Sequence, residues 1–500
     1  MSFLSPDLIL IRPQLLLALF GIGILLTDFL IEPGEKVWNA VMAMLGVIFA
    51  AFSVWQVHTQ VSGTMAPKMA FSQSIVLDDF AVFFCIIFLS AAALAILLSV
   101  RYFEIEQEQH GEYYALILFA TIGMMFMVEG IDIIVQFIAL ETMAITFYVL
   151  AGFLRHDRRS NEAALKYLLL GAFSSGIFAY GLSLIYGLTG STNLGVIMAK
   201  VDDLNQAHAS GFAPLLMLAL VTTGAGLLFK VAAVPFHQWA PDIYEGAPTP
   251  VTAFLSVAST AASFGLLIRL FVTVFWPARD QWTFLLGAVA VASMTVGNLA
   301  ALSQNNIKRM LAYSSISHAG YVLLGLVAAA TGDGNEKGLQ GMAFYLFAYA
   351  FMNMGAFAIV IILRRKGLIG DTLEDLNGLI TRAPGAAVML LIFMLSLAGI
   401  PPTIGFIGKY YIFLALLQTG HYYLAVFAAL YVVPALYYYF RLIVHAFLKD
   451  STDVVATVVT PWQKIAIAFT GIVVLAAGIY PEPFIQLATT SIASFVSFGH

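Results

Sequence analysis

Charge and cysteine are both scarce in this sequence. Of its 500 residues, only 10% are Asp, Glu, Lys or Arg, and the single cysteine, Cys85, lies within an apolar stretch. One cysteine excludes an iron–sulfur cluster or a cysteine metal site carried by this chain alone. No G-x-G-x-x-G or Walker-type loop occurs, so nucleotide binding has no support. We therefore expect no cofactor and no metal in this chain, and no nucleic-acid partner.

Long hydrophobic runs, in contrast, are abundant. Hydrophobic residues make up 61% of the chain, the mean hydropathy is +0.92, and apolar stretches of about 20 residues recur from end to end. This pattern predicts an all-α polytopic membrane protein in a lipid bilayer, with about 14 transmembrane helices. The hydrophilic stretches between them are too short for a soluble domain with its own core. The helices are expected to begin near residues 8, 37, 78, 114, 131, 163, 214, 247, 281, 308, 339, 386, 421 and 464.

The basic residues indicate how the helices are oriented. Most of the 23 Lys and Arg residues lie in loops that follow odd-numbered predicted helices. Because basic loops remain in the cytoplasm, both termini are predicted on the opposite, outer side of a bacterial inner (plasma) membrane. The first apolar run has neither a basic n-region nor a small-residue cleavage site, so we expect it to be a retained helix.

Four ionisable residues lie near the middle of predicted helices, at the depth of the hydrocarbon: Glu141, Lys230, His318 and Lys409. An ionised side chain at the bilayer centre is unfavourable by about 2.5–3.5 kcal/mol even on mild insertion scales. Such residues are therefore expected to be functional. A series of titratable groups at one depth is what a proton path across a membrane requires, because each group must hold a proton and pass it on.

Glu141 and Lys230 form the first candidate pair. Glu141 lies about 15 Å from the outer end of a helix predicted at residues 131–154. Lys230 belongs to the seventh predicted helix, where Pro235 removes a backbone hydrogen bond and should break the helix. A nearby lysine would favour the ionised form of Glu141. The alternative is a neutral Glu141 that only hydrogen-bonds between packed helices.

A second interrupted helix resembles the first. Gly399, Pro401, Pro402 and Gly405 interrupt the long apolar span of the twelfth predicted helix, which carries Lys409. Corresponding breaks in two halves of a transporter indicate an inverted repeat with the ion site at its interface. Because the breaks are five helices apart, helices 4–8 and 9–13 would cross in opposite directions. The predicted parts are helices 1–3 at residues 1–110, the first repeat at 111–275, the second at 276–449 and helix 14 at 450–500.

The remaining polar residues within helices carry weaker signals. His318, with an ordinary pKa near 6.5, suits reversible protonation, and a hydrogen-bonded core histidine is the alternative. Lys166 lies only a few residues into its helix, so proton transfer and extension of its side chain to the interface are both open. Arg12 and Arg269 lie close to helix ends and are expected to extend to the interface.

Hydroxyl and amide side chains also form two stripes at helical spacing. Either stripe could hold water or join helices through hydrogen bonds, and the second role is more common. In the turn before the eighth helix, His237, Asp242 and Glu245 are expected mainly to support the turn, with proton uptake as the alternative. The stripes consist of Ser256, Ser259, Thr260 and Ser263 on the eighth helix and Tyr345, Tyr349 and Asn353 on the eleventh.

Several segments of the sequence resemble a known family. They are Leu140–Met143, Asn161–Tyr167, Phe229–His237, Tyr244–Val251, Asn306–His318 and Gly399–Lys409. Over essentially the whole chain, the sequence resembles the antiporter-like membrane subunits of proton-pumping NADH–quinone oxidoreductase, respiratory complex I. Two features favour the N-type branch, also called subunit 2. The chain ends soon after helix 14, and helix 12 carries a lysine where M-type subunits usually carry glutamate.

The resemblance implies 14 helices in two inverted five-helix repeats, a pumping pair formed by Glu141 and Lys230, and a terminal lysine at Lys409. It also implies proton translocation from the cytoplasm to the outer face, driven by electron transfer from NADH to quinone in partner subunits. FMN, iron–sulfur clusters and quinone are expected in those partners. The expected neighbours are the M-type antiporter-like subunit and the small K-, J- and A-type subunits.

One departure from the family concerns the eighth helix. Members commonly carry a bridging lysine there, where this chain has Thr260. Because Thr260 cannot hold a proton charge at neutral pH, we hypothesise that water ordered by Ser259, Thr260 and His318 bridges Lys230 and Lys409; a weaker link is the alternative. Other possible functions are a subunit of a multisubunit cation/proton antiporter, a subunit of a hydrogenase-linked or photosynthetic complex, and a nonconducting scaffold.

Overall fold

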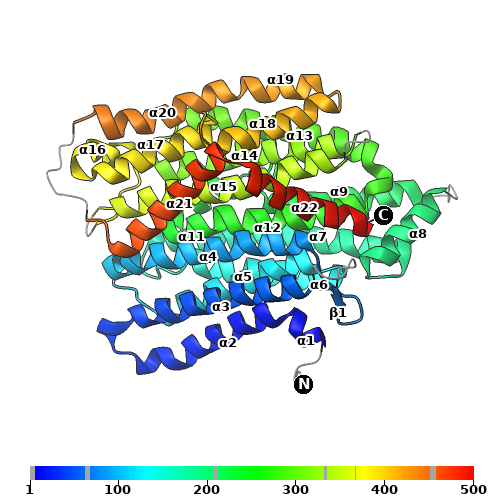
Figure 1. Ribbon diagram of the computed structural model, residues 1–500, viewed down its shortest axis with the longest axis horizontal. Coiled ribbons are helices and arrows are strands. Elements are labelled where there is room, and N and C mark those ends of the chain that lie inside the picture. The colour runs from blue at the N-terminus through cyan, green and yellow to red at the C-terminus, as the bar shows by residue number, and fades with distance from the viewer. Residues whose placement is uncertain are drawn as a thin grey trace.

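The chain folds into a bundle of nearly parallel helices (Figure 1). This computed structural model describes residues 6–61, 68–206, 212–331, 335–365, 368–450 and 458–499. Within these ranges, 13 helical segments are long and apolar enough to cross a membrane, and α17 (Pro384–Ala398) and α18 (Ile404–Gln418) are two shorter apolar helices. The prediction of an all-α polytopic membrane protein is therefore confirmed.

The elements follow one another with short connections, including a small antiparallel hairpin of β1 and β2. They are α1 (Pro6–Leu10), α2 (Arg12–Thr27), α3 (Val37–Val61), β1 (Lys68–Ala70), β2 (Ile75–Leu77), α4 (Asp79–Glu106), α5 (Gly111–Glu129), α6 (Ile133–Ala151), α7 (Arg158–Thr189), α8 (Leu194–Gln206), α9 (Phe212–Lys230), α10 (Trp239–Gly246), α11 (Thr249–Phe254), the π-helical turn η3 (Leu255–Ser259), α12 (Thr260–Thr273), α13 (Arg279–Leu302), α14 (Ile307–Ala329), α15 (Asn335–Leu363), α16 (Leu379–Arg382), α17, α18, α19 (Tyr422–Leu430), α20 (Val432–Leu448), α21 (Pro461–Ile479) and α22 (Glu482–Gly499). Short 3₁₀ turns lie at Asp28–Leu30, Pro33–Glu35, Trp276–Ala278 and Leu373–Leu376.

Local side-chain chemistry sets the ends of the helices that carry candidate residues. The carboxylate of Asp132 accepts a hydrogen bond from the backbone N–H of Ile134 at 2.8 Å and caps α6. The side chain of Asn306 caps α14 through the N–H of Arg309 at 3.0 Å. Gly190 ends α7 with a φ of +64°, a left-handed conformation that glycine adopts readily.

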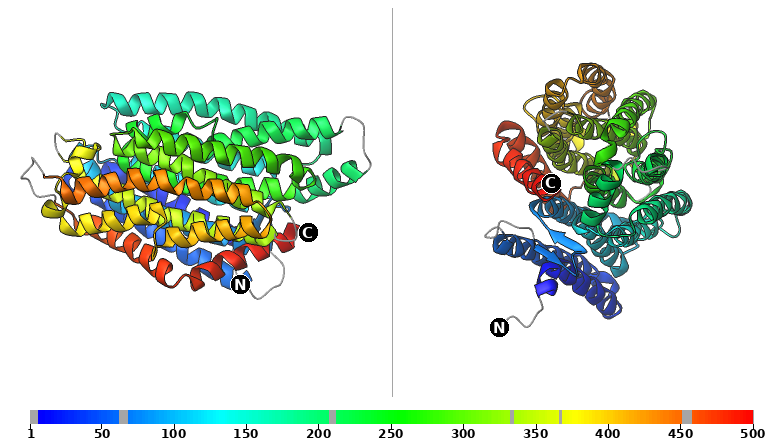
Figure 2. Two further views of the ribbon diagram at one scale, coloured as in Figure 1. Left: turned by 90° about the horizontal axis from the view of Figure 1, so that it is seen from above. Right: turned by 90° about the vertical axis from the view of Figure 1, so that its right-hand side faces the viewer.

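The most buried helices lie at the centre of the bundle. Within an apolar stretch of 18 residues in each segment, all residues are buried in Thr249–Thr273 and Glu336–Leu363 and 94% in Ile307–Ala329, whereas only 28% are buried in Arg12–Leu30 and Tyr422–Leu448. Figures 1 and 2 show α2 and α3 at one edge of the bundle and α19 and α20 at the opposite edge. The apolar faces of these outer helices suit contact with lipid, and the polar candidate residues lie on or beside the central helices.

Both interruptions predicted from proline and glycine are present. α9 ends at Lys230, and residues 231–238 are non-helical before α10 begins. α17 ends at Ala398, and α18 begins at Ile404. α9 follows α8 at one end of the bundle, whereas α17 follows α16 at the other end, so the two broken helices run in opposite directions (Figure 1). α1 and the last turns of α22 lie toward the α8 end (Figure 1).

Arg269 does not behave as expected. Its side chain is 1% exposed, and its Nη2 lies 2.8 Å from each carboxylate oxygen of Asp78. Its Nε also donates to the carbonyl of Val128. The expectation that Arg269 extends to the interface is wrong, because a buried acid 191 positions earlier in the chain supplies a partner inside the protein.

Two helices of more than ten residues, and the short α10 and α16, lie outside the predicted set. α8 occupies part of the hydrophilic stretch that precedes α9, at the end of the bundle where the β-hairpin lies (Figure 1). α22 follows α21 after Tyr480 and Pro481, and it packs against α4 and α15. The described part of residues 450–500 therefore holds two helices, where the sequence predicted one.

Candidate functional site

Lys230 and Glu141 lie on α9 and α6, which both pack against α7. Lys230 is 3% exposed, and its Nζ donates to the hydroxyl of Tyr148 on α6 at 3.4 Å. Glu141 lies near the middle of α6, and its buried Oε1 has no hydrogen-bond partner among the described residues. The two side chains interact electrostatically, but no direct ion pair joins them within the described ranges. The structure therefore brings them into range of each other's charge without contact.

Lys409 is held by the end of a broken helix. It is 4% exposed, and its Nζ donates to the backbone carbonyls of Leu397 at 3.1 Å and Ala398 at 3.0 Å. Both carbonyls belong to the last turn of α17, where no further helical N–H is available to them. The same Nζ lies 5.1 Å from the centre of the Tyr321 ring, so the ammonium also has a favourable aromatic contact.

His318 lies on α14 between two phenol groups. Its Nδ1 is 2.5 Å from the hydroxyl of Tyr345, and its Nε2 is 3.0 Å from the hydroxyl of Tyr439. The hydroxyl of Tyr439 also meets that of Ser314. Lys409 lies close enough to His318 to influence it electrostatically. His318 and Lys409 are thus neighbours in one buried polar region.

The eighth predicted helix is irregular at its polar stripe. The π-helical turn η3 contains Ser256 and Ser259 and joins α11 to α12, which begins at Thr260. The side-chain nitrogen of Asn353 donates to the hydroxyl of Ser256 at 2.8 Å, and Ser263 donates to the carbonyl of Ser259. Single π-helical turns within α-helices are frequent at functional sites. This turn faces the polar stripe of α15.

Hydroxyl groups connect this turn to His318. The hydroxyl of Tyr244 on α10 lies within reach of those of Thr260 and Ser315. The hydroxyl of Tyr349 is near Ser315 but meets no partner in hydrogen-bonding geometry among the described residues. The rings of Tyr349 and His318 are 5.2 Å apart between centroids. The hydroxyl of Thr260 thus belongs to a cluster of hydroxyl-bearing side chains that extends to the ring of His318.

A line of aromatic rings joins Lys230 to this hydroxyl cluster. The Nζ of Lys230 lies 6.0 Å from the centre of the Phe229 ring, and Phe229 lies 5.5 Å from Trp239 between centroids. Trp239 donates through Nε1 to the carbonyl of Phe229 at 2.8 Å, and its ring lies 6.3 Å from that of Tyr244. The last turn of α9 and α10 therefore form a continuous packing link between Lys230 and Tyr244.

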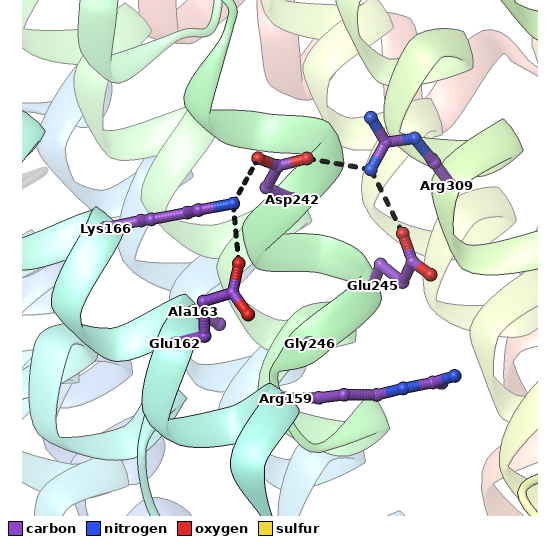
Figure 3. A pocket seen from close by; sticks show the side chains of 8 residues that line it. All are labelled: Arg159, Glu162, Ala163, Lys166, Asp242, Glu245, Gly246 and Arg309. Atoms are coloured by element: carbon purple, nitrogen blue, oxygen red, sulfur yellow. Dashed lines mark hydrogen bonds and ion pairs between the residues drawn. The ribbon is translucent and has the colours of Figure 1, made fainter.

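Lys166 belongs to a polar pocket (Figure 3) beside the first turns of α7, at the end of this helix away from α8. Its Nζ lies 2.8 Å from Asp242 and 2.9 Å from Glu162. Arg309 of α14 lies 2.7 Å from Asp242 and 3.0 Å from Glu245, so Asp242 joins α7 to α14 (Figure 3). The pocket holds about 230 Å³ and is lined by Arg159, Glu162, Ala163, Lys166, Asp242, Glu245, Gly246 and Arg309.

Burial and charged neighbours together set the protonation states of Asp242 and His237. Burial raises the pKa of Asp242, but hydrogen bonds from Lys166 and Arg309 outweigh burial and hold the pKa below its ordinary value. Asp242 is therefore ionised at neutral pH. Burial lowers the pKa of His237, despite a hydrogen bond with Pro235 that raises it, so His237 is neutral there. Asp242 connects helices in addition to supporting the turn.

Several buried ionisable residues were not identified from the sequence as site candidates, among them Glu129 and Lys308. Glu129 is 1% exposed, and the amide nitrogen of Gln14 lies 2.7 and 2.6 Å from its two carboxylate oxygens. Lys308 was assigned to a loop, but it is 4% exposed and donates to the carbonyl of Ala247 at 2.7 Å. Both residues lie at helix ends, where local sequence suggests solvent, and their partners are far away in the chain. No local signal distinguishes them.

The described residues contain no group of three or more His, Cys, Asp or Glu placed to hold a metal ion. A family model described as NADH:quinone oxidoreductase/Mrp antiporter, TM, matches residues 130–433. This range includes both broken helices, the π-helical turn and all four mid-depth residues. Fold and site together thus define the class of antiporter-type membrane subunits.

Full-length relatives narrow this class. The chain is 53% identical to NADH-quinone oxidoreductase subunit N 1 of Koribacter versatilis, covering 97% of this chain and 96% of the relative. It is 52% identical to subunit N 2 of Solibacter usitatus, covering 98% of each. A chain in the solved structure of respiratory complex I from Thermus thermophilus with bound aureothin is 32% identical, with a TM-score of 0.79, covering 95% of this chain and 99% of that chain. The chain belongs to the family of NADH-quinone oxidoreductase N subunits, which confirms the predicted N-type branch.

Proposed function

We propose that this chain moves protons from the cytoplasm to the outer face of the membrane, driven by electron transfer from NADH to quinone in partner subunits. The observation that carries the proposal is that Lys230 and Lys409 are each buried beside a helix break and that each has polar partners. A nonconducting scaffold has no use for two buried amines at mid-depth, since each is unfavourable by several kcal/mol in hydrocarbon. The names of the relatives support the coupling to NADH and quinone.

The first step is a change of charge at Lys230. Glu141 stabilises the protonated amine; at a separation of about 6 Å and an effective dielectric near 20, the attraction is about 3 kcal/mol. This is comparable to moving one charge through about 100 mV, which is about 2.3 kcal/mol. When the pair separates or Glu141 gains a proton, Lys230 releases its proton. A conformational or electrostatic change, caused by quinone chemistry in partner subunits, separates Glu141 from Lys230.

The second step carries the proton to His318. A phenol hydroxyl can donate or accept a hydrogen bond, so Tyr345 and Tyr439 can partner both ring nitrogens in the neutral and in the protonated state. The buried hydroxyl of Tyr349 and the side-chain oxygen of Asn353 have no partner among the described residues. Buried polar atoms of this kind bind internal water. Such water would bridge the position of Thr260.

The third step ends at Lys409. The carbonyls of Leu397 and Ala398 carry the partial negative charge of a helix C-terminus, which favours a protonated amine. Because α17 and α18 are separated by a non-helical segment, water can reach this amine without crossing hydrocarbon. Lys409 is therefore the group that releases protons toward the outer face.

Lys166 takes part at the cytoplasmic side. Its ion pair with Asp242 lies in a polar pocket on α10, the helix that also carries Tyr244. We propose that this pocket collects protons and that Lys166 transfers them inward.

We also propose an arrangement of the chain in the complex, based on its membership of the N-subunit family. Residues 111–275 and 276–449 form the two inverted repeats, flanked by residues 1–110 and 450–500. The chain lies in a bacterial inner membrane with both termini on the outer side. Its proposed neighbours are the M-type subunit and the small K-, J- and A-type subunits. The proposed sites of FMN, iron–sulfur clusters and quinone are in other subunits.

The test measures NADH-driven proton uptake by the whole complex in sealed vesicles. Lys230→Ala is expected to abolish uptake while the complex still assembles, and His318→Gln is expected to reduce it strongly. Lys200→Ala, which removes an exposed lysine of α8, is the matched control and should pump normally. If His318→Gln pumps as well as the control while Lys230→Ala does not, the relay role of His318 is wrong. If sodium exchange without NADH oxidation is found instead, the chain works as a cation/proton antiporter subunit.

A further inference from the structure

One face of α7 carries a stripe that changes from polar to apolar along the helix. The residues of this stripe recur every three or four positions, which places them on the same face. The polar half lines the pocket shown in Figure 3, and the apolar half lines a second pocket of about 290 Å³. The stripe consists of Arg159, Glu162 and Lys166, then Leu170, Phe173 and Ile177.

The opposite wall changes in the same direction. Asp242 and Glu245 on α10 line the polar pocket, and Trp239, at the start of α10, lines the apolar pocket with Pro235. α9 stops at Lys230, so the wall of the apolar pocket passes from the last turns of α9 through a non-helical segment to α10. The break in the helix thus produces the apolar pocket. The two pockets follow one another along α7, between it and the broken helix, and together are called the groove.

The groove has the length of one lipid leaflet. Ala163 and Ile177 are 14 positions apart on α7, which corresponds to about 21 Å at 1.5 Å per residue. One leaflet with its headgroups is about 20–22 Å thick. The charged end lies toward the end of the bundle, and the apolar end lies toward the membrane interior. Length and polarity therefore both match one phospholipid.

Two side chains at the charged end retain binding capacity for a ligand. Arg159 is 53% exposed, and its nearest acid is Asp371 at 3.6 Å. Glu162 is 60% exposed, and its one ion pair among the described residues is with Lys166, through one carboxylate oxygen. An anion can therefore bind Arg159, and a cation can bind Glu162, while the ion pairs of Asp242 stay intact. A site with one partly exposed group of each sign suits a zwitterionic headgroup.

We propose that this groove binds one phospholipid whose headgroup carries a phosphate and a primary ammonium, the phosphatidylethanolamine class. The phosphate lies at Arg159, the ammonium donates to Glu162, and an acyl chain covers Leu170, Phe173 and the non-helical segment after Lys230. A primary ammonium offers three N–H donors to carboxylates, whereas a trimethylammonium offers none and a glycerol headgroup carries no cation. The proposal does not depend on the proton path.

The test uses the complete complex in vesicles that contain a photoactivatable phosphatidylethanolamine with a diazirine in its acyl chain. Labelling is expected on peptides that cover residues 159–177 or 235–246. Arg159→Gln should lower this labelling about tenfold, since a hydrogen bond to a charged group contributes about 1.5–3 kcal/mol. Arg101→Gln, which removes a half-exposed arginine that does not line the groove, should label like the wild type.

Parallel vesicles carry the same diazirine on phosphatidylglycerol or phosphatidylcholine. Equal or stronger labelling of these peptides by either lipid would overturn the assignment of the headgroup. A chemical cross-link from α7 to a neighbouring subunit across the groove would show that a protein segment covers it, and would overturn the lipid site itself. Native mass spectrometry of the wild-type complex provides a test without variants, because one retained phosphatidylethanolamine per chain is expected there.

Discussion

The two helix breaks use the same backbone device but surround their lysines differently. Lys230 is the last residue of α9 and faces a hydroxyl at 3.4 Å and the charge of Glu141. Lys409 lies after its break and reaches back to two backbone carbonyls. A carboxylate can gain or lose charge, whereas a carbonyl dipole is fixed. The charge of Glu141 can therefore change the protonation of Lys230. The carbonyls around Lys409 instead provide an electrostatic environment that stays constant.

Lysine-to-arginine changes at the two breaks keep both charges but prevent deprotonation. Lys230→Arg and Lys409→Arg retain a cation, and arginine does not release its proton in proteins. If both amines must deprotonate in each cycle, each variant should lose NADH-driven proton uptake by about tenfold or more. Native gels check assembly, and Lys200→Arg is the matched control. Normal pumping by either variant would make that lysine a structural residue.

Glu141→Gln removes the feature that distinguishes the first break. Without the carboxylate, Lys230 loses its switchable partner, and proton uptake should fall by up to about tenfold, equivalent to about 1.4 kcal/mol. Initial rates of proton uptake at several membrane potentials provide the measurement. Glu104→Gln removes an exposed acid on α4 and should have no effect. A wild-type rate for Glu141→Gln would mean that the two breaks work alike.

The backbone turns of the two breaks predict opposite responses to one methyl group. Gly399 has a φ of +85°, and an added Cβ would lie 2.8 Å from the Cδ of Lys409. Gly399→Ala should therefore displace Lys409 and destabilise the chain by about 1–2 kcal/mol through the left-handed backbone. The first break already contains a left-handed alanine, Ala232, with a φ of +54°. Ala232→Gly should keep pumping and unfold no earlier on heating, whereas Gly399→Ala should unfold earlier; the reverse order would contradict this account.

The smallest expected effect concerns the ion pairs that hold α10 beside the first break. Asp242→Asn should weaken the link between Lys166 and Arg309, and amides of α10 should exchange hydrogen faster at pH 7. The stability loss should be below about 1 kcal/mol, because the groups are partly exposed. The folded-state pKa of Asp242 is lowered, so its stabilisation is present above about pH 3.9 and is lost as pH falls through the folded pKa. The thermal midpoints of wild type and variant should therefore converge only in strong acid.

The sequence predicted those parts of the site that depend on local chemistry. Pro235 and the glycine and proline residues near 399–405 located both breaks, and the cost of buried charge identified Lys230 and Lys409. The partners of Lys409 could not be predicted, because they are backbone carbonyls that become available only when the chain turns back. The tyrosines on both sides of His318 come from α15 and α20, and no local pattern indicates that they meet. The path across Thr260 likewise depends on Tyr244, which lies in a segment interpreted as a turn.

The ion pair between Asp78 and Arg269 constrains how the polypeptide can be made. The acid leaves the ribosome 191 residues before its partner, and each buried charge is unfavourable without the other. The β1–β2 hairpin therefore cannot pack stably against α4 and α5 until α12, which carries Arg269, has been inserted into the membrane. Truncated chains that stop before Arg269 should remain with the insertion machinery or be degraded, so the first half of this protein matures only when the second has begun to arrive.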